Sequence, residues 1–425
     1  MNVLVIGNGG REHAIVAALS KSPKVDKIYC MKGNAGIAEL AELVDVNYCD
    51  LKAVGDWVDA HEDVKYTVIA PDDPLALGLA DELESRGHRV FGPNKRAAEI
   101  ESSKAFAKEL MKKYGIPTAK YETFSDCEKA LAYVEKGSFP VVLKADGLAL
   151  GKGAVIVNSF EEAEKTVNEM MVERVFGASG DRILVEEFLT GPEVSVLSFT
   201  DGKAVVPMVS SMDHKRAKDN DEGLNTGGMG TVAPNPYYTE EIAGTCMETI
   251  FLPTIRAMNA EGRTFRGCLY FGLMLTKDGP KVIEYNCRFG DPETQVVLPL
   301  LRSDLLEIML AVRGGCLRED MVRFRKGAAC CVVLASEGYP KKYDTGFAVS
   351  LPETGPDEDI YIAGAKLENG KLVTSGGRVL GAVATADSLK EAVGRAYALA
   401  DKIHFENAYM RRDIGKRALA ALEDR

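Results

Sequence analysis

A carboxylate, an amide and a guanidinium stand at alternate positions where an apolar segment ends: Glu284, Asn286 and Arg288. The apolar residues 282–283 predict a strand, and alternate residues of a strand face the same side. Two oxygen ligands suit Mg²⁺, and a planar guanidinium pairs with phosphate oxygens. The pattern therefore predicts either a site for a metal and a phosphate or a strand end with a solvated salt bridge. Other parts of the chain have to decide between the two.

The composition excludes several classes of protein. The chain has 425 residues, 46% of them hydrophobic, and a formal net charge of −11. This length predicts a soluble globular protein of about two to four domains, and the acidic total argues against a nucleic-acid partner. The amino terminus enters an apolar strand without a basic segment before it, and no apolar run reaches about eighteen residues, so we expect neither a signal peptide nor a membrane span. Nine cysteines without Cys-x-x-Cys spacing predict reduced thiols in a cytoplasmic protein.

Three regions must position these side chains. From residue 1 to about 98, short apolar strands alternate with helices, which predicts a parallel sheet with helical cover. From 99 to 325, strands arrive in pairs joined by short glycine-containing loops, which predicts antiparallel hairpins. These pairs are 141–144 with 154–157 and 183–186 with 193–197. Residues 326–425 predict a small closing domain, so the expected fold class is a multidomain combination of α/β and α+β.

A glycine-rich loop, Gly7 to His13, follows the first strand and opens the first helix. Backbone N–H groups at the start of a helix attract a phosphate. The dinucleotide pattern requires a third glycine where this chain has Glu12, whose carboxylate disfavours a pyrophosphate. The loop is consistent with a site for a monophosphate or a polar substrate, in which Arg11 pairs with the phosphate, or with a purely structural turn.

Two further glycine-rich loops and one strand junction have the composition of ligand sites. Residues 146–153 lack the hydroxyl residue and the helix of a P-loop, so they predict a flexible hairpin that folds over a triphosphate. Residues 225–230 predict either a backbone cradle for an anion or a mobile loop. The junction at 186–193 can offer backbone groups to adenine and a carboxylate to ribose, or it is a solvated acidic strand end.

Taken in chain order, these motifs closely resemble the ATP-grasp superfamily and, within it, the phosphoribosylamine–glycine ligase family. The resemblance spans essentially the whole chain, and the string from Asn286 to Glu293 is its most specific part. The other segments that carry it are 3–13, 91–93, 103–106, 144–149, 213–216, 225–230 and 412–415.

The resemblance implies a reaction and a domain plan. Members of the family join glycine to 5-phosphoribosylamine with ATP through a glycyl phosphate, and release ADP, phosphate and glycinamide ribonucleotide in purine biosynthesis. The implied plan is an amino-terminal α/β substrate domain (1–98), a central ATP-grasp domain (99–325) with a mobile lid at about 120–190, and a carboxy-terminal α+β domain (326–425). It also implies Mg²⁺ or Mn²⁺ as cofactor, a cytoplasmic monomer or weak dimer, and neither a nucleic-acid nor a membrane partner.

Residues that match the family motifs acquire expected roles by position. Glu284 and Asn286 resemble the metal ligands and Arg288 the residue that neutralises the transferring phosphate, with Lys144 and Asp213 as further catalytic residues. The residues that resemble the ATP-binding set are Lys104, Lys144, Lys152, Glu186, Glu187, Leu189 and Glu193. The residues that resemble the substrate-binding set are Asn8, Gly9, Gly10, Arg11, Glu12, Asn225, Thr226, Gly227 and Gly228.

The chain departs from the family pattern in two places. Asp72 stands where relatives usually carry a glutamate, so its carboxylate is a methylene shorter. The segment 272–275 offers no acidic residue for a second metal, whose ligands would then be water or phosphate. Three other interpretations compete: another ATP-grasp ligase, a Rossmann-type oxidoreductase, and a silent nucleotide-binding regulator. The missing glycine opposes the oxidoreductase, and the presence of Lys144 and Arg288 opposes the silent regulator.

Overall fold

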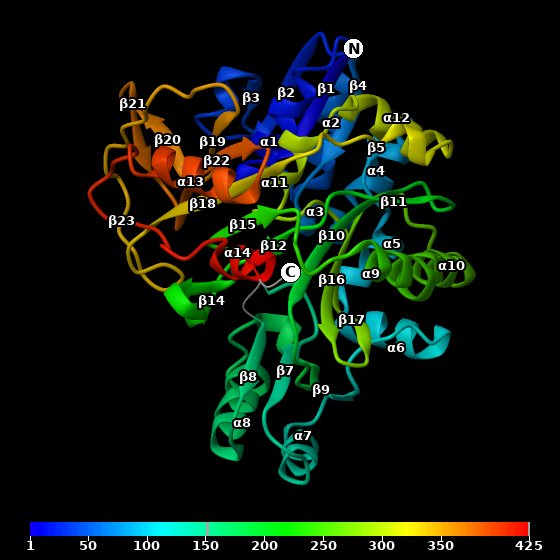
Figure 1. The fold of residues 1–425 in the computed structure, drawn as a ribbon. Coiled ribbons are helices and arrows are strands. Elements are labelled where there is room, and N and C mark those ends of the chain that lie inside the picture. Colours follow the sequence, from blue (N-terminus) through cyan, green and yellow to red (C-terminus); the bar gives the residue numbers. More distant parts are fainter. Residues whose placement is uncertain (150–152, 424–425) are drawn as a thin grey trace.

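The structure is a computed structural model that describes residues 1–149 and 153–423. The amino-terminal region, drawn blue in Figure 1, and the carboxy-terminal region, drawn orange and red, lie side by side, and a smaller green sheet extends away from both. Within the described residues, no helix is long and apolar enough to span a membrane. All nine cysteines are free, as the sequence predicted.

The amino-terminal region is a parallel sheet with the strand order β3-β2-β1-β4-β5. Its central strand β1 (Asn2–Gly7) is apolar because a central parallel strand is covered on both faces, and Val3 to Ile6 are fully buried. The predicted parallel α/β arrangement is confirmed. The other elements are α1 (Gly10–Leu19), β2 (Lys27–Lys32), β3 (Glu42–Val44), α2 (Leu51–Ala60), β4 (Val64–Ile69), α3 (Asp72–Leu77), α4 (Leu79–Ser85) and β5 (Val90–Phe91).

The extension at the bottom of Figure 1 is an antiparallel sheet with the order β6-β9-β7-β8, which we call the lid. The predicted hairpin of β7 with β8 is confirmed. The lid packs around a hydrophobic cluster of its own, so it has the separate core that a body moving as one unit requires. Its elements are β6 (Tyr121–Phe124), α7 (Cys127–Glu135), β7 (Val141–Ala145), β8 (Ala154–Val157), α8 (Phe160–Val167) and β9 (Ile183–Glu187).

A second antiparallel sheet, with the order β11-β10-β16-β17, forms the floor of the central region. The predicted hairpin of β9 with β10 is wrong, because β9 pairs with β6 and β7 in the lid while β10 pairs with β11 and β16 in the floor. Gly191, with a φ of 147°, lies in the turn that leads the chain from one sheet to the other. The elements here are α5 (Lys95–Ser102), α6 (Lys104–Tyr114), β10 (Glu193–Thr200), β11 (Val205–Pro207), α9 (Glu240–Cys246), α10 (Leu252–Ala260), β16 (Gly267–Thr276) and β17 (Gly279–Asn286).

The third large sheet has the order β12-β15-β18-β22-β19, and β23 also pairs with β18. Its strands β12 and β15 come from the middle of the chain, so the carboxy-terminal segment shares its sheet with the central segment. The domain boundaries after residues 98 and 325 stay predictions. The strands are β12 (Met212–Asp213), β15 (Gly230–Ala233), β18 (Ala328–Ser336), β19 (Glu358–Ile362), β22 (Arg378–Ala386) and β23 (Ala408–Tyr409). The helices are α11 (Thr294–Val297), α12 (Leu305–Gly314), α13 (Leu389–Ala400) and α14 (Lys416–Glu423), and two small hairpins are β13 (Arg216–Lys218) with β14 (Glu222–Asn225) and β20 (Ala365–Glu368) with β21 (Lys371–Thr374).

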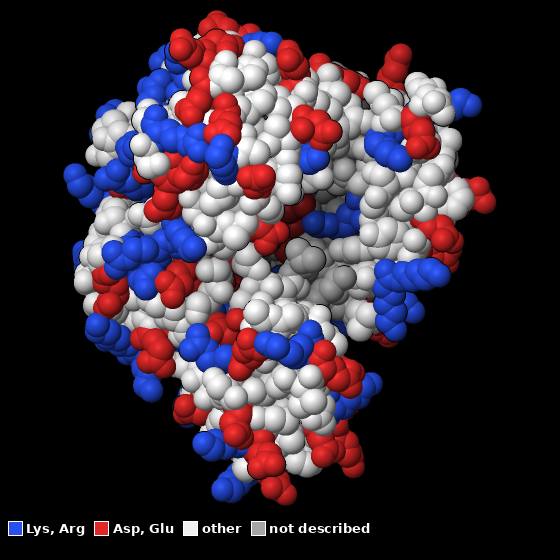
Figure 2. All heavy atoms as spheres, turned by 180° about the vertical axis from the view of Figure 1, so that it is seen from behind, with Lys and Arg blue, Asp and Glu red and all other residues white. Residues whose placement is uncertain are grey.

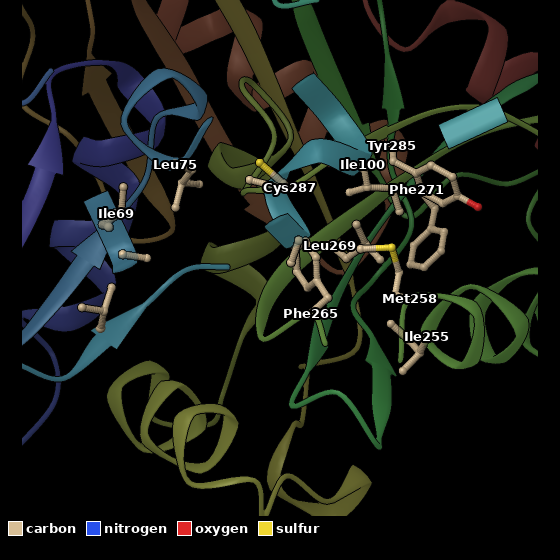
Figure 3. Close-up of a cluster of buried hydrophobic side chains, with 14 of the residues drawn as sticks. Ile69, Leu75, Ile100, Ile255, Met258, Phe265, Leu269, Phe271, Tyr285 and Cys287 are labelled. Atoms are coloured by element: carbon tan, nitrogen blue, oxygen red, sulfur yellow. The ribbon is translucent and has the colours of Figure 1, made fainter. Parts of the chain in front are cut away.

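One hydrophobic cluster joins the amino-terminal sheet to the floor sheet. Ile69 and Leu75 come from the amino-terminal region, and Phe271 and Tyr285 from β16 and β17 (Figure 3). The ring of Phe271 is fully buried, 4.2 Å from the ring of Phe251. Burial of one such side chain contributes about 2–3 kcal/mol. The cluster therefore fixes the position of β17, which carries the row of polar residues found in the sequence.

Candidate active site

A cleft of about 700 Å³ lies between the lid, the floor sheet and both terminal regions. Figure 2 shows a hollow near the middle of the face opposite that of Figure 1, with acidic and basic side chains in it. The cleft brings together these sequence-predicted residues: Arg11, Lys104, Lys144, Glu186, Glu187, Leu189, Glu193, Asp213, Asn225, Thr226, Gly227, Glu284, Asn286 and Arg288. Lys152 lies outside the described residues. The described residues along the cleft do not include Asn8, Gly9, Gly10, Glu12 or Gly228.

The end of β17 carries the polar row along the floor of the cleft. The pairing of β17 with β16 shifts by one residue at Ile283, and such a bulge re-aims the side chains beside it. Glu284, Asn286 and Arg288 all line the cleft. Tyr285 also borders it, but its side chain is buried in the hydrophobic cluster beneath. The expectation that the three polar side chains share one side is confirmed.

Glu284 is an ionised carboxylate among cations. Burial opposes its ionisation, but four nearby cations lower the pKa of Glu284 to about 2. These cations are Lys215, Lys144, Lys104 and Arg288. The Nζ of Lys215 lies 3.5 Å from a carboxylate oxygen of Glu284 and 3.5 Å from one of Glu193. Lys215 belongs to a motif that the sequence analysis quoted, but it was not predicted as a site residue.

Arg288 is held in place by an acid that the sequence analysis missed. Its Nη2 lies 3.0 Å from Glu101 Oε1 and donates to Asn286 Oδ1 at 3.1 Å. The other oxygen of Glu101 accepts the N–H of Cys287 at 2.7 Å. Among the described residues, the buried Nε of Arg288 has no hydrogen-bond partner. The guanidinium is therefore oriented by Glu101, and its Nε–H is left for a ligand.

Two lysines share one carboxylate at the lid side of the cleft. Lys144 Nζ lies 3.0 Å and Lys108 Nζ 2.9 Å from the same oxygen of Glu186. Lys144 also donates to the carbonyl of Ile283 in the bulge at 3.0 Å. The other oxygen of Glu186, Oε1, is buried and has no partner among the described residues. Lys108 was missed, although its spacing of four residues from Lys104 on α6 places both on one helix face.

Lys104 connects α6 to the glycine-rich loop of the lid. Its Nζ donates to the carbonyl of Gly147 at 2.7 Å, and burial lowers the pKa of Lys104. The carboxylate of Asp146 accepts the N–H of Ala105 at 3.0 Å, which caps the start of the same helix. The loop is thus attached to α6 at its beginning, before the residues that lie outside the described part.

The loop at residues 225–228 does not present free N–H groups to a ligand. The N–H of Thr226 donates to Lys215 O at 2.8 Å, that of Gly227 to the hydroxyl of Tyr339 at 3.1 Å, and that of Gly228 to Thr226 Oγ1 at 3.0 Å. The expected cradle for an anion is therefore not formed in this conformation. What the loop offers to the cleft is the side chain of Asn225, which donates to Ala154 O at 3.4 Å.

The carboxy-terminal region contributes Arg378, which the sequence analysis also missed. Its Nη1 donates to the carbonyls of Gly227 at 2.8 Å and Asp291 at 3.0 Å, and its Nη2 lies 2.8 Å from Asp291 Oδ2. Arg378 and Asp291 both line the cleft. This arginine therefore joins β22 to the loop at 225–228 and to the family-specific string at 286–293.

The carboxylate of Glu12 caps the start of α1, the helix to which it belongs. Glu12 Oε2 accepts the N–H of Gly9 at 2.6 Å, and Glu12 Oε1 lies 2.7 Å from Arg11 Nη2. The carboxylate thus occupies the helix start, where one of the two sequence interpretations placed a phosphate or polar substrate and the other a structural turn. Arg11 still reaches the cleft, and its Nη1 donates to the carbonyl of Phe289 at 3.1 Å. Asp72 lies nearby, and although burial opposes it, Arg288 and Arg11 lower the pKa of this carboxyl group.

Asp213 has the opposite electrostatic surroundings to Glu284. Burial, and then the neighbouring carboxylate of Glu293, raise the pKa of Asp213 well above its ordinary value. Its Oδ1 accepts the N–H of His214 at 2.7 Å. A carboxyl group that holds its proton is a hydrogen-bond donor to a ligand rather than a fixed negative charge.

The donor set at the floor suits a hard divalent cation. Glu284 keeps its charge at neutral pH, and Asn286 adds an amide oxygen, which are the ligand types of Mg²⁺. In the described residues, no group of three or more His, Cys, Asp or Glu side chains could hold a metal. Two protein ligands with phosphate and water oxygens in the remaining positions are typical of Mg²⁺ bound with a nucleotide.

Comparison of the sequence with family models shows to which protein family the chain belongs. The family models for phosphoribosylglycinamide synthetase match three consecutive parts of the chain: the N domain at residues 1–101, the ATP-grasp (A) domain at 102–294 and the C domain at 329–417. The chain belongs to the phosphoribosylglycinamide synthetase family. The resemblance inferred from the motifs is therefore confirmed, as is the ATP-grasp fold.

Relatives of this family match over nearly their full length. The phosphoribosylamine–glycine ligase of Caldanaerobacter subterraneus is 48% identical over 414 residues, which cover 97% of this chain and 99% of the relative. That of Escherichia coli is 45% identical over 425 residues, 99% of each. The crystal structure of the Thermotoga maritima enzyme of that name has a TM-score of 0.86 at 36% identity, covering 97% of this chain and all of that one. A biotin carboxylase domain from Hydrogenobacter thermophilus, 18% identical with a TM-score of 0.76, shares the fold alone.

Proposed function

We propose that the chain ligates glycine to 5-phosphoribosylamine with ATP, giving glycinamide ribonucleotide, ADP and phosphate. The observation that supports it most is the ionised Glu284 beside Asn286 and Arg288, surrounded by lysines on the floor of a cleft, in a chain whose whole length matches this family. We also propose that the protein is a cytoplasmic monomer or weak dimer and that it acts in purine biosynthesis.

The first step transfers the terminal phosphoryl group of ATP to glycine. A carboxylate oxygen of glycine attacks the γ-phosphorus, the bond to the bridging oxygen breaks, and ADP leaves with that electron pair. The unpaired Nε of Arg288 and the ammonium groups of Lys104 and Lys144 neutralise the charge on the phosphates. Glu284 and Asn286 would hold the Mg²⁺ or Mn²⁺, which supplies further positive charge to the phosphate oxygens.

The second step forms the amide bond. The amine of phosphoribosylamine attacks the carbonyl carbon of glycyl phosphate, phosphate leaves, and the amine loses a proton. Water would hydrolyse this intermediate, so the lid must cover the cleft while it exists. Asp213, which favours its protonated form, lies on the cleft where it can donate a hydrogen bond to a reacting oxygen.

The lid side of the cleft would bind the nucleoside of ATP. Within the described part of the chain, Oε1 of Glu186 has no hydrogen-bond partner, and it can accept a hydrogen bond from the amino group of adenine. We assign the backbone of Glu187 and Leu189 to the edge of the base and Glu193, at the start of β10, to the ribose hydroxyls. On the family resemblance, we assign Lys152 to the phosphates of ATP.

The amino-terminal and carboxy-terminal sides of the cleft would bind the other two substrates. We assign phosphoribosylamine to the segment from Asn8 to Glu12, within which Arg11 is the cation that reaches the cleft. We assign glycine and its acyl phosphate to Asp213 and the loop at 225–228. In the described conformation, the N–H groups of this loop are paired, so its side chains and a rearrangement on binding would supply those contacts.

The test follows an oxygen atom from glycine to phosphate. Purified protein is given ATP, phosphoribosylamine and glycine labelled with ¹⁸O in its carboxylate. We expect ADP only when both other substrates are present, and one labelled oxygen in each phosphate released. Release of unlabelled phosphate, or equal ADP formation with bicarbonate or formate in place of glycine, would refute the proposal.

A further inference from the structure

The carboxylate of Glu186 is held by two ammonium groups on one side only. Lys108 and Lys144 approach Oε2 at 2.9 and 3.0 Å, whereas Oε1 has no partner among the described residues. The side chain of Glu186 is 4% exposed, and it lies on the wall of the cleft. A buried acceptor without a donor costs free energy unless a ligand supplies the donor.

Lys108 reaches this carboxylate from α6, and its ammonium group makes all its hydrogen bonds to groups of the protein. Besides Glu186, its Nζ donates to Thr118 Oγ1 at 2.8 Å and to Ala119 O at 3.5 Å. An ammonium group has three protons, so all of them have acceptors here. Its side chain is 3% exposed. Lys108 therefore acts on a ligand through Glu186 rather than by direct contact.

Lys144 alone would not give the same arrangement. It divides its hydrogen bonds between Glu186 and Ile283 O, and its charge also acts on Glu284. Among the residues that the structure describes, Glu186 is the acidic partner of Lys108 within hydrogen-bond distance. Without Lys108, Oε2 of Glu186 would keep one ammonium partner instead of two, and the carboxylate could turn away from its present orientation.

We propose that Lys108 is a positioning residue that holds Oε2 of Glu186 and so keeps Oε1 turned to the base, and that the site thereby selects 6-amino over 6-oxo purine nucleotides. An ionised carboxylate only accepts hydrogen bonds, which suits an exocyclic amino group and repels a carbonyl oxygen at the same place. The inference rests on the proposed function, since it presumes that the base of the nucleotide lies against Glu186.

The test compares ATP with inosine triphosphate, which replaces the 6-amino group by an oxygen. Glycine-dependent formation of the nucleoside diphosphate is measured for the natural protein and for Lys108→Met. We expect the natural protein to prefer ATP by about 10²-fold in kcat/KM, because a site built for a donor rejects an analogue without it. In Lys108→Met the preference should fall by about 10-fold or more, mainly through a higher KM for ATP, with kcat within about 3-fold.

Lys112→Met is the matched control, because Lys112 lies one turn further along α6 and is exposed. Both lysines lie near the ring of Tyr121, at 5.6 Å for Lys108 and 5.8 Å for Lys112, so the control removes a similar ring contact without touching Glu186. It should leave the preference for ATP unchanged. Thermal unfolding of both variants shows whether either has lost its fold.

A second variant keeps the inference testable if Lys108→Met does not fold. In Glu186→Gln the amide can turn its NH₂ group to a 6-oxo base, so activity with inosine triphosphate should rise relative to ATP. An unchanged ratio in folded Lys108→Met or Glu186→Gln, or a natural protein that uses both nucleotides equally, overturns the inference and leaves the proposed ligation intact. A natural protein without glycine-dependent activity on either nucleotide overturns the proposed function itself.

Discussion

Replacement of Glu284 by glutamine tests the centre of the proposed site. The substitution keeps the size and one oxygen of the side chain but removes a negative charge that four cations surround. In the proposed site Glu284 is the charged metal ligand among the described residues, so a divalent cation would bind less tightly and would neutralise less of the charge on the phosphates. We expect kcat/KM for ATP to fall by about 10³-fold, the range found when one preorganised charge or donor at a transferring group is removed.

The surroundings of Glu284 also limit how much stability the glutamine variant can lose. The pKa of Glu284 is lowered from 4.5 to about 2, since burial is outweighed by the four cations, and this corresponds to about 3 kcal/mol in favour of the ionised form. Because 33% of the side chain is exposed, solvent screening reduces the contribution to about 1–2 kcal/mol. A lowered carboxyl pKa stabilises the fold above pH 4.5, and this contribution is lost as the pH falls towards 2. At neutral pH the variant should therefore be folded but slightly less stable.

The assay is ADP formation at increasing Mg²⁺ concentration, with thermal unfolding measured in parallel. Asp278→Asn is the matched control, because Asp278 is an exposed acid in the turn that joins β16 to β17. The control should retain the natural metal dependence and rate. Near-natural turnover of Glu284→Gln at low Mg²⁺ would remove Glu284 from the metal site, and a folded variant with unchanged stability would contradict the electrostatic argument.

Three further outcomes follow from buried groups. Glu101→Gln removes the buried acid that orients Arg288, which should destabilise the protein by about 3 kcal/mol and lower kcat; unchanged kcat in denaturant-free buffer would contradict this role. Phe271→Ala should destabilise by about 3–5 kcal/mol in urea unfolding, and a loss below about 1 kcal/mol would show that the joint core is not tightly packed. Burial lowers the pKa of His13 and of His214 to about 4, so each histidine takes up a proton on unfolding between pH 6.5 and 4. Stability should fall over that range by up to about 3 kcal/mol per histidine, and His13→Asn should flatten the pH dependence of unfolding.

The parts of the site that were predictable depend on local spacing. The period of two along β17 placed Glu284, Asn286 and Arg288 on one side, and the structure agrees because the bulge lies before them rather than among them. The hairpin of β7 with β8 was predictable because its strands are joined by a short loop. Adjacent strands with a short connection pair in most folds, so these predictions needed no long-range information.

The same rule failed at the junction between β9 and β10. Gly191 and Pro192 looked like a hairpin turn, yet Glu187 pairs with Val141 in the lid and Glu193 with Met274 in the floor. In each of these two pairs, the partner residue is more than forty positions away in the sequence. Local turn chemistry cannot reveal that a chain passes from one sheet to another. This passage places the junction, to which we assign the base of the nucleotide, between lid and floor.

The missed residues are the buried partners of the predicted ones. Glu101 orients Arg288, Lys108 holds Glu186, and Arg378 joins Asp291 to the loop at 225–228. Glu101 and Arg288 are far apart in the sequence, so their pairing depends on how α5 packs against the end of β17. Of these three, Lys108 had a sequence signal, the four-residue spacing from Lys104, and Lys215 lay within the quoted motif at 213–216.

The net charge of the whole chain is negative, whereas cations predominate around Glu284 in the cleft. The net charge of −11 argues against a nucleic-acid partner, but it does not describe the cleft, where four cations converge on Glu284. In a low-dielectric site such a cluster is tolerated because acids such as Glu101 and Glu186 lie behind it. The acids compensate part of the cationic charge from behind, and in the proposed function the side of the cations that faces the cleft is left for the triphosphate. The chemistry therefore depends on the buried acids as much as on the cations that meet the substrate.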